Sequence, residues 1–268
     1  MIELKKPVKT LNEFLERIKD LRRGWPSKNK PTRQGEQENL WFRGQPSAKW
    51  GLSPKLYRKE YRGAQEAEIR QDFQSRALQL MQGRTPHRDD KWEWYFLMQH
   101  YGVPTRLLDW TDNPVIALFF AVSDQPEPGK SAVWVLDPWW LNRQLRKGID
   151  GPMLPGWEEA EPYLWDLEDA FTRDVDVRAQ KPAAIDPPHV DRRLAAQKSR
   201  FIIFGRIRDL ARTEVVRQSD GRLAKMTIAE SSVGPIRREL EDCGVTVSAV
   251  FPDLEHLGQE IRALWRAF

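Results

Sequence analysis

The sequence predicts an α+β protein in which mixed or antiparallel sheets are flanked by helices. Short runs of β-branched and aromatic residues mark strands, and longer segments with apolar residues three or four positions apart mark helices. The two kinds of element mix along the chain without the strict alternation that builds a doubly wound parallel sheet, and no internal repeat is visible. These features favour an α+β fold over a parallel α/β fold.

Composition indicates a globular chain in a reducing compartment. The 268 residues are 40% hydrophobic and 31% charged, which is enough for one large domain or two small ones. Cys243 is the single cysteine, so no internal disulfide can form, and the four histidines lack metal-ligand spacing. No apolar run approaches the roughly 20 residues of a membrane span, and the N-terminus lacks the apolar core of a signal peptide. We therefore expect a cytoplasmic protein without a membrane partner.

Helix signals divide the chain into an N-terminal helix over residues 1–24 and a main domain over residues 25–268. Thr10 and Glu13 form a capping box at the start of the first helix. Further helices are predicted over residues 58–82, 90–100, 114–122, 138–146, 235–243 and 254–264. Strands are predicted over residues 40–44, 105–108, 131–136, 201–204, 224–228 and 245–250. Residues 148–190 are rich in Pro, Gly, Asp and Glu and are predicted to form an irregular insertion or lid with some helix.

The C-terminal part carries three further expectations. Gly244 is expected to end the helix before it, and Cys243 to be packed on that helix rather than reactive. In the last helix, apolar residues recur at helical spacing and predict one apolar face; they are Leu254, Leu257, Ile261 and Leu264.

The segment from His100 to Val122, HYGVPTRLLDWTDNPVIALFFAV, organises the chain. Residues 105–108 predict a buried strand and residues 109–113 a polar turn. Asn113 suits an N-cap, and Pro114 suits the first position of the buried helix that follows. Such a corner directs turn groups and helical N–H donors at one place, which suits a phosphate or another anion. The alternative is that the polar side chains only cap the backbone.

A second informative segment surrounds Arg43, which stands near the end of a predicted strand beside Gly44 and Gln45. An arginine in that position is well placed for bidentate contact with a phosphate or carboxylate. The alternative is an ion pair with a neighbouring acid. His100 is in the same way either a ligand contact or a packed, hydrogen-bonded residue.

Four segments together resemble the FRG-domain family. They are WFRGQ at 41–45, the central HYGVPTRLLDWTDNPVIALFFAV at 100–122, LAAQKSRFIIFG at 194–205 and VFPDLEHLGQEI at 250–261. The resemblance extends over about residues 25–265. The family commonly has a glycine two residues after the glutamine, where this chain has Ser199. That change matters only if the backbone there needs a positive φ.

A further resemblance, to ADP-ribosyltransferases, concerns the layout of polar residues along the chain. It implies that NAD is the substrate, that Arg43 holds it, and that Thr111 or Asp109 takes the middle position of the site. Gln197 would stand where those enzymes carry a glutamate. Glutamine can bind a ribose hydroxyl but cannot supply the negative charge that stabilises an oxocarbenium, so Asp109 or Asp112 would have to do so. Otherwise the protein binds a nucleotide without turnover.

Site assignments follow from these resemblances. The predicted catalytic residues are Asp109, Thr111 and Gln197. The predicted nucleotide-binding residues are Arg43, Gly44, Gln45, His100, Arg106, Trp110 and Asn113. No residue is assigned to a metal.

Three hypotheses remain open at this point. The first is an NAD-dependent ADP-ribosyltransferase or NAD-glycohydrolase with an unidentified acceptor. The second is a non-catalytic domain for a nucleotide or nucleic acid, which the net charge of +4 and the stretches rich in Trp and Arg favour. The third is a buried structural network of Arg43, Asp109 and Gln197.

Overall fold

The computed structural model describes residues 2–25, 40–61, 65–81, 85–123, 129–144, 151–158, 160–164, 181–188, 192–213, 216 and 222–266. In these residues, seven strands form one sheet in the order β1-β7-β4-β2-β3-β6-β5. The strands are β1 (Ile2–Val8), β2 (Trp41–Gln45), β3 (Leu107–Thr111), β4 (Ser131–Leu136), β5 (Ala183–Ile185), β6 (Ser199–Ile203) and β7 (Leu223–Ile228). β1 and β7 pair in parallel, and the other neighbours in the sheet pair antiparallel.

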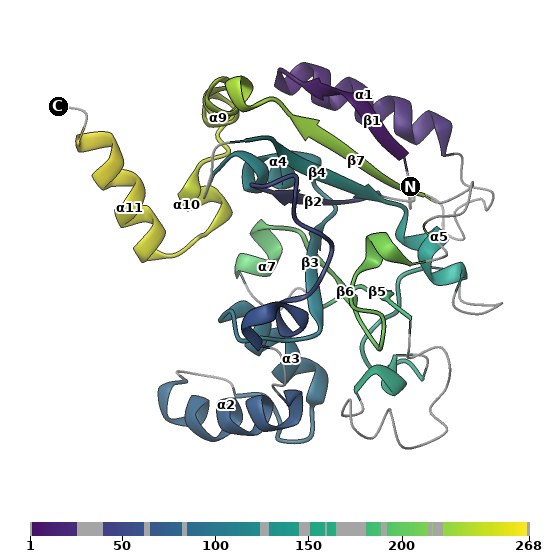
Figure 1. Ribbon diagram of the computed structural model, residues 1–268. Helices are drawn as coiled ribbons and strands as arrows, with labels where there is room; N and C mark the ends of the chain where they lie inside the picture. The colour runs from purple at the N-terminus through teal and green to yellow at the C-terminus, as the bar shows by residue number, and fades with distance from the viewer. Residues whose placement is uncertain are drawn as a thin grey trace, which may run out of the picture.

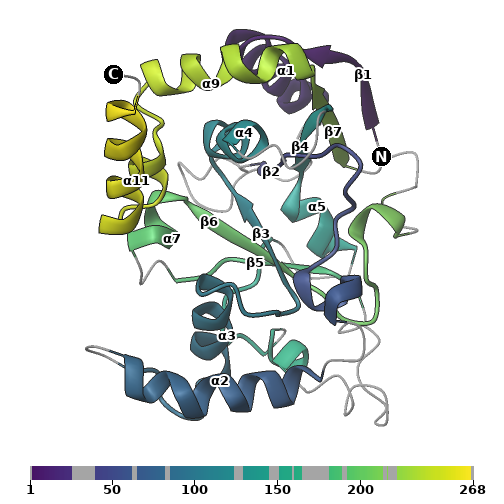
Figure 2. The ribbon, with the colours of Figure 1, turned by 60° about the vertical axis from the view of Figure 1, so that its left-hand side comes forward.

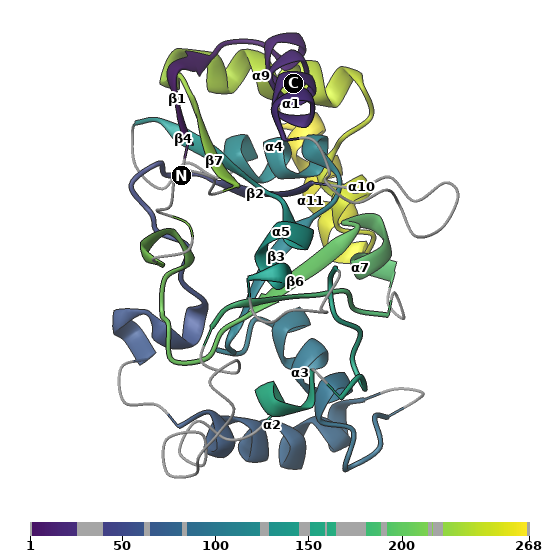
Figure 3. The same ribbon diagram turned by 90° about the vertical axis from the view of Figure 1, so that its right-hand side faces the viewer.

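Helices surround this sheet. The α-helices are α1 (Leu11–Gly24), α2 (Glu66–Leu80), α3 (Lys91–His100), α4 (Pro114–Ser123), α5 (Pro138–Arg143), α7 (Arg192–Ala196), α9 (Val233–Asp242), α10 (Val247–Val250) and α11 (Leu254–Trp265). Short 3-10 helices are η1 (Lys55–Tyr57), η2 (Lys59–Tyr61), η3 (Glu161–Leu164), η5 (Leu210–Arg212) and η6 (Glu230–Ser232). Figures 1 and 3 show α1 and α9 at one end of the molecule and α2 and α3 at the opposite end. A mixed, mostly antiparallel sheet surrounded by helices confirms the predicted α+β class.

The start of α1 follows the predicted capping pattern. The Thr10 hydroxyl accepts a hydrogen bond from the N–H of Glu13 at 3.1 Å. The Glu13 carboxylate reaches back and accepts from the N–H of Lys9 at 2.9 Å, one residue before the usual return bond. Phe14 and Ile18 are then buried on the inner face of the helix. The sequence analysis did not predict β1, which joins the sheet through β7.

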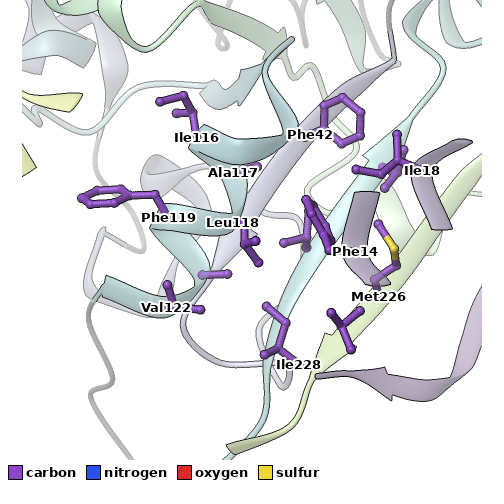
Figure 4. Close-up of a cluster of buried hydrophobic side chains, with 14 of the residues drawn as sticks. Phe14, Ile18, Phe42, Ile116, Ala117, Leu118, Phe119, Val122, Met226 and Ile228 are labelled. Carbon is purple, nitrogen blue, oxygen red and sulfur yellow. The ribbon is translucent and has the colours of Figure 1, made fainter. Parts of the chain in front are cut away.

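One core cluster lies where α1, α4 and α9 meet the sheet. Phe14 of α1, Phe42 of β2, Leu118 of α4 and Met226 of β7 belong to it, and Figure 4 shows their side chains together. α4 is apolar and buried on most of its surface, as its sequence predicts. The cluster therefore holds the helix that follows β3 tightly against the sheet.

Gly44 determines how closely α4 approaches the sheet. A Cβ atom at this position would lie 1.8 Å from the carbonyl oxygen of Ala117 and 2.7 Å from the backbone nitrogen of Ala121. Those contacts are with backbone atoms, which cannot rotate away as a flexible side chain can. β2 therefore packs directly against the backbone of α4 because residue 44 has no side chain.

The sheet divides between β2 and β3. These two strands share a single register pair, Phe42 with Thr111, whereas β2 pairs along its whole length with β4, and β3 pairs along its whole length with β6. The backbone groups of β3 before Thr111 are consequently not used by β2. This division leaves room for side chains between the two strands.

Most of the described tryptophans are core residues. Those that are at most 4% exposed are Trp41, Trp92, Trp94, Trp110, Trp134 and Trp140. Trp50, Trp157 and Trp265 are 46%, 48% and 74% exposed. The high tryptophan content therefore serves packing more than an exposed stacking surface.

Three predicted element boundaries are corrected by the structure. The predicted turn at 109–113 is shorter, because β3 continues to Thr111 and places Asp109 within the strand. The long helix predicted over 58–82 is limited to α2, preceded by η1 and η2. Residues 148–190 contribute β5, η3 and buried side chains such as Tyr163 to a core cluster, so their described part is more than an irregular lid.

The strand predicted over residues 245–250 is wrong. Thr246 caps the short helix α10 by accepting from the N–H of Ala249. A short apolar run does not distinguish a strand from a helix, and here the capping threonine decides. Gly244, with φ of 77°, follows the end of α9 as predicted. Cys243 is exposed rather than packed.

The last helix carries its apolar residues on the surface. Leu254, Leu257, Ile261 and Leu264 are 86%, 41%, 47% and 64% exposed. Figure 2 shows α11 at the edge of the molecule, and Figure 1 shows α10 next to it. Within the described part of the chain, no helix is long and apolar enough to cross a membrane.

The close approach at Gly44 gives a first prediction. Gly44→Ala should lower the free energy of unfolding by about 1–3 kcal/mol or more, because its methyl group overlaps the α4 backbone. Gly234→Ala is the matched control, since a Cβ there meets nothing within 4 Å, and it should be neutral or stabilising by up to about 1 kcal/mol. Urea denaturation measures both changes. Equal stability of the two variants would show that α4 does not rest on the β2 backbone.

Candidate functional site

Arg106 lies in the core at the start of β3, where it forms a buried ion pair with Glu66 of α2. The two side chains are 2% and 1% exposed, and the Arg106 guanidinium donates to the Glu66 carboxylate. It also donates to the Tyr95 hydroxyl at 3.0 Å and to the Tyr163 carbonyl at 2.7 Å. Burial alone would lower the pKa of Arg106, but Glu66 and the neighbouring tyrosines raise it above its ordinary value. Arg106 is therefore a charged residue that joins α2, α3 and η3 to β3.

Arg43 differs from Arg106 in its partners. Its Nη1 donates to the backbone oxygen of Asp109 at 2.6 Å and lies 3.8 Å from the Asp109 carboxylate. The side chain is 15% exposed, and its buried Nε has no hydrogen-bond partner among the described residues. Burial lowers the pKa of Arg43 to about 10; Asp109 opposes this shift, and the nearby Arg58 adds to it. Arg43 thus keeps its charge at neutral pH with a donor still unused.

The Asp109 carboxylate is hydrogen-bonded to the protein on one side and open to solvent on its other side. The Gln99 amide nitrogen donates to both of its oxygens, at 2.9 Å each. The Gln99 carbonyl oxygen accepts from the Thr105 hydroxyl at 2.5 Å. The Asp109 side chain is 58% exposed. Arg43, Gln99, Thr105 and Asp109 therefore form one connected group, which we call the Arg43–Asp109 cluster.

Thr111, Asn113 and Gln197 form a second, neighbouring set of contacts. The Thr111 hydroxyl donates to the backbone oxygen of Gln197 at 2.7 Å and accepts from the N–H of Asn113 at 3.0 Å. Asn113 accepts from the N–H of Val115 at 3.0 Å, as expected of a residue that caps α4. The Gln197 amide itself donates to the Val250 carbonyl at 3.3 Å. The structure therefore joins Gln197 to Thr111 through its main chain and directs its side chain toward α10.

Asp112, the other candidate acid, is paired with Arg200. The carboxylate accepts from Arg200 Nη2 at 2.7 Å, and the two side chains are 14% and 16% exposed. Arg200 also lies 3.0 Å from Asp186. Asp109 is thus the more accessible of the two acids that the sequence analysis proposed.

The left-handed backbone near this corner is at Lys198, with φ of 46°, rather than at Ser199. Ser199 begins β6 and pairs with Thr111. The change from the family's usual glycine to Ser199 is therefore compatible with the backbone.

Four of the predicted site residues have fold-related contacts. Gly44 packs on α4, and Arg106 binds Glu66 in the core. The Gln45 amide accepts from the Trp134 indole at 2.8 Å and donates to the Gly51 carbonyl at 3.0 Å. Trp110 is 3% exposed and packs in a core cluster, where its indole nitrogen is buried without a hydrogen-bond partner in the described residues. Their proposed roles in nucleotide binding stay predictions.

His100 lies at the end of α3, next to Gln99. Its ring contacts Tyr101 at a centroid distance of 4.8 Å, and its backbone oxygen accepts from Arg193 at 3.4 Å. The side chain lines a cleft of about 940 Å³ together with Trp92 and Phe96, whereas Gln99 does not line that cleft. His100 is therefore close to the Arg43–Asp109 cluster in sequence, but none of the four residues of that cluster lines the cleft beside His100.

Sequence reasoning missed Gln99 and Thr105. Gln99 lies inside a helix whose aromatic neighbours dominate the pattern, and Thr105 begins a predicted buried strand. Their contact depends on the chain reversal after α3. There Gly102 adopts φ of 70°, and its N–H donates to the backbone oxygen of Gln99 at 3.0 Å. Only the glycine hints at this reversal in the sequence. Among the described residues, no group of three or more His, Cys, Asp or Glu side chains could hold a metal ion.

The contrast between the two arginines gives a second prediction. Arg106→Met should lower the free energy of unfolding by about 3–5 kcal/mol, because Glu66 is left buried without its cation. Arg43→Met should change it by about 1 kcal/mol or less, since the Asp109 carboxylate is reached by water. Urea denaturation measures both. The double variant with Glu66→Met should recover much of the Arg106 loss, and equal losses for the two single variants would contradict this division of roles.

Comparison with known proteins supports two of the four segments that resemble the FRG-domain family, those at 41–45 and 100–122; the segments at 194–205 and 250–261 lie outside the match. The family model described as FRG domain matches residues 38–130, which contain β2, α2, α3, β3 and α4. All four members of the Arg43–Asp109 cluster fall within the matched residues. No curated protein and no solved structure matches the chain. The family match identifies residues 38–130 of the chain as an FRG domain.

Proposed function

We propose that this FRG domain binds NAD at the Arg43–Asp109 cluster and breaks the bond between nicotinamide and ribose. The observation that carries the proposal is the state of Arg43. It is a nearly buried cation with a lowered pKa and an unused donor, beside a carboxylate that faces solvent. Perturbed ionisable groups that persist without a full set of protein partners are typical of binding and catalytic sites.

Arg43 supplies the anion-binding part of the proposed site. A guanidinium binds phosphate oxygens through several parallel N–H donors, and such charge-assisted hydrogen bonds are stronger than neutral ones. Arg58 adds positive charge close by, as its effect on the Arg43 pKa indicates. The NAD pyrophosphate is the group that these two charges would attract.

Asp109 supplies the negative charge in the proposed reaction. When the bond between ribose C1′ and the nicotinamide nitrogen breaks, its electron pair leaves with nicotinamide and C1′ becomes an oxocarbenium. A carboxylate beside the ribose stabilises that positive charge and accepts hydrogen bonds from the ribose hydroxyls. Water or an acceptor group then forms the new bond to C1′ and releases a proton.

Asp109 fits this role better than Gln197. The resemblance to ADP-ribosyltransferases implied an acid where this chain has Gln197, and the Gln197 amide is directed at the Val250 carbonyl. Asp112 is neutralised by Arg200. Asp109 keeps an accessible charge close to Arg43, so it supplies the negative charge that a glutamate provides in ADP-ribosyltransferases.

A second candidate function is nucleotide binding without turnover. Asp109 is 58% exposed, and water screens an exposed charge, which reduces its ability to stabilise a transition state. Water screens the charge of Arg43 less than that of Asp109, because the Arg43 side chain is only 15% exposed. Binding through Arg43 would therefore be weakened less by screening. This observation makes turnover the more demanding half of the proposal.

Binding is tested by replacing Arg43. Arg43→Ala should weaken NAD binding by about 10- to 100-fold, because charge-assisted hydrogen bonds contribute roughly 1.5–3 kcal/mol. Isothermal titration calorimetry with NAD measures the dissociation constant. Arg212→Ala is the matched control, since Arg212 is 81% exposed and lies on η5, and it should bind as the wild type does. Equal affinities for the wild type and Arg43→Ala would remove Arg43 from the site.

Turnover is tested separately at Asp109. Asp109→Asn keeps the shape of the side chain but removes its charge, so nicotinamide release should fall by about 100-fold or more while NAD binding changes only a few-fold. Chromatographic detection of nicotinamide measures release. A wild type that binds NAD but releases no nicotinamide, with or without added protein acceptors, would select binding without turnover.

A further inference from the structure

We infer that Gln99 and Thr105 are positioning residues that aim the Asp109 carboxylate at the hydroxyl groups of a ribose. The inference rests on the proposed function and names the part of the ligand that Asp109 contacts. It assigns the recognition of the ribose to the chain of hydrogen bonds from Thr105 through Gln99 to Asp109. Arg43, in contrast, recognises the phosphates.

The direction of this chain is fixed at its inner end. The Thr105 hydroxyl accepts from the N–H of Leu107 at 3.1 Å, so its own hydrogen is free to be donated to the Gln99 carbonyl oxygen at 2.5 Å. The amide of a glutamine has one accepting and one donating end. Once Thr105 occupies the accepting end, the donating end must face Asp109. Thr105 is fully buried, so the chain starts from a rigid part of the core.

The outer end of the chain fixes the orientation of the carboxylate. The Gln99 nitrogen lies 2.9 Å from each Asp109 oxygen, so the carboxylate presents both oxygens symmetrically to the amide. An ionised carboxylate has about four acceptor positions, and the amide occupies only those on the protein side. The remaining positions face solvent, because the side chain is 58% exposed. Two neighbouring hydroxyls of a ribose can donate to two such oxygens together.

A purely structural role explains this arrangement less well. A carboxylate that is more than half exposed is already solvated by water, and ordering a long glutamine side chain against it costs conformational entropy. Arg43 does not need the carboxylate to be oriented, because its short contact is with the Asp109 backbone oxygen. The described neighbours therefore give no stability reason to hold the carboxylate in one orientation, whereas a ligand that binds both oxygens does.

Two substitutions of Thr105 distinguish a positioning role from a structural role, because the two roles predict opposite orders of effect for the variants. Thr105→Val keeps the volume of the side chain but removes the hydroxyl, so Gln99 loses the bond that orients its amide. Thr105→Ser keeps the hydroxyl but removes a buried methyl group, which creates a small cavity. The measured quantity is the ratio of dissociation constants for two probes. They are NAD and the NAD analogue that lacks the 2′ and 3′ hydroxyls on the nicotinamide ribose.

The wild type should bind NAD about tenfold more tightly than the deoxygenated analogue. A tenfold difference in affinity corresponds to the net contribution of about one hydrogen bond. Thr105→Val should reduce this ratio to near one, and Thr105→Ser should restore most of it even where its melting temperature is the lower of the two. Gln99→Leu should behave as Thr105→Val does. Thr213→Val is the matched control, because it also removes a buried threonine hydroxyl, in this case one that donates to the backbone oxygen of Leu210. The ratio of dissociation constants for this variant should equal that of the wild type.

The possible failures are distinct. If the wild type binds neither probe, the proposed function is overturned and the inference falls with it. If the wild type binds both probes equally, or if Thr105→Val keeps the wild-type ratio, the positioning role alone is overturned. If the ratios follow the melting temperatures of the variants instead of the presence of the hydroxyl, Thr105 is a structural residue only.

Discussion

The ion pair between Arg106 and Glu66 determines where β3 begins. Both side chains are almost fully buried, and a buried charge without its partner costs several kcal/mol, so α2 and the start of β3 have to meet. From that fixed point, three further residues along the chain place Asp109 in β3 next to β2. The other bonds of Arg106 tie α3 and η3 to the same place, so the segments that carry Gln99, Thr105 and Asp109 share one anchor.

The division of the sheet between β2 and β3 gives the molecule its unusual polar cluster. Had the two strands paired along their length, the Asp109 backbone oxygen would bind a strand N–H, and Arg43 would have no acceptor there. Because they pair only at Phe42 and Thr111, the Arg43 guanidinium takes that acceptor instead. Gly44, the next residue, brings α4 against β2. A single short segment thus supplies a charged group to the cluster and a packing surface to the core.

Sequence patterns predicted the parts of this arrangement that depend on local chemistry. The Asn113 cap and the Pro114 start of α4 follow from residue type and spacing. The proximity of Arg43 to Asp109 joins residues far apart in the sequence and is implied only by the resemblance to ADP-ribosyltransferases. The contacts of Gln99 and the direction of the Gln197 amide did not follow, because each depends on how the chain turns between elements. The apolar run before Phe251 predicts a strand but forms the helix α10, since periodicity cannot separate short strands from short helices.

A structure of the protein crystallised with ADP-ribose tests the central claim most directly. The account predicts phosphate oxygens within hydrogen-bond distance of the Arg43 guanidinium and ribose hydroxyls within hydrogen-bond distance of the Asp109 carboxylate. The Gln99 amide should keep its contact with that carboxylate in the complex. A ligand bound in the cleft beside His100, with the Arg43–Asp109 cluster unchanged and in contact only with solvent, would contradict the account.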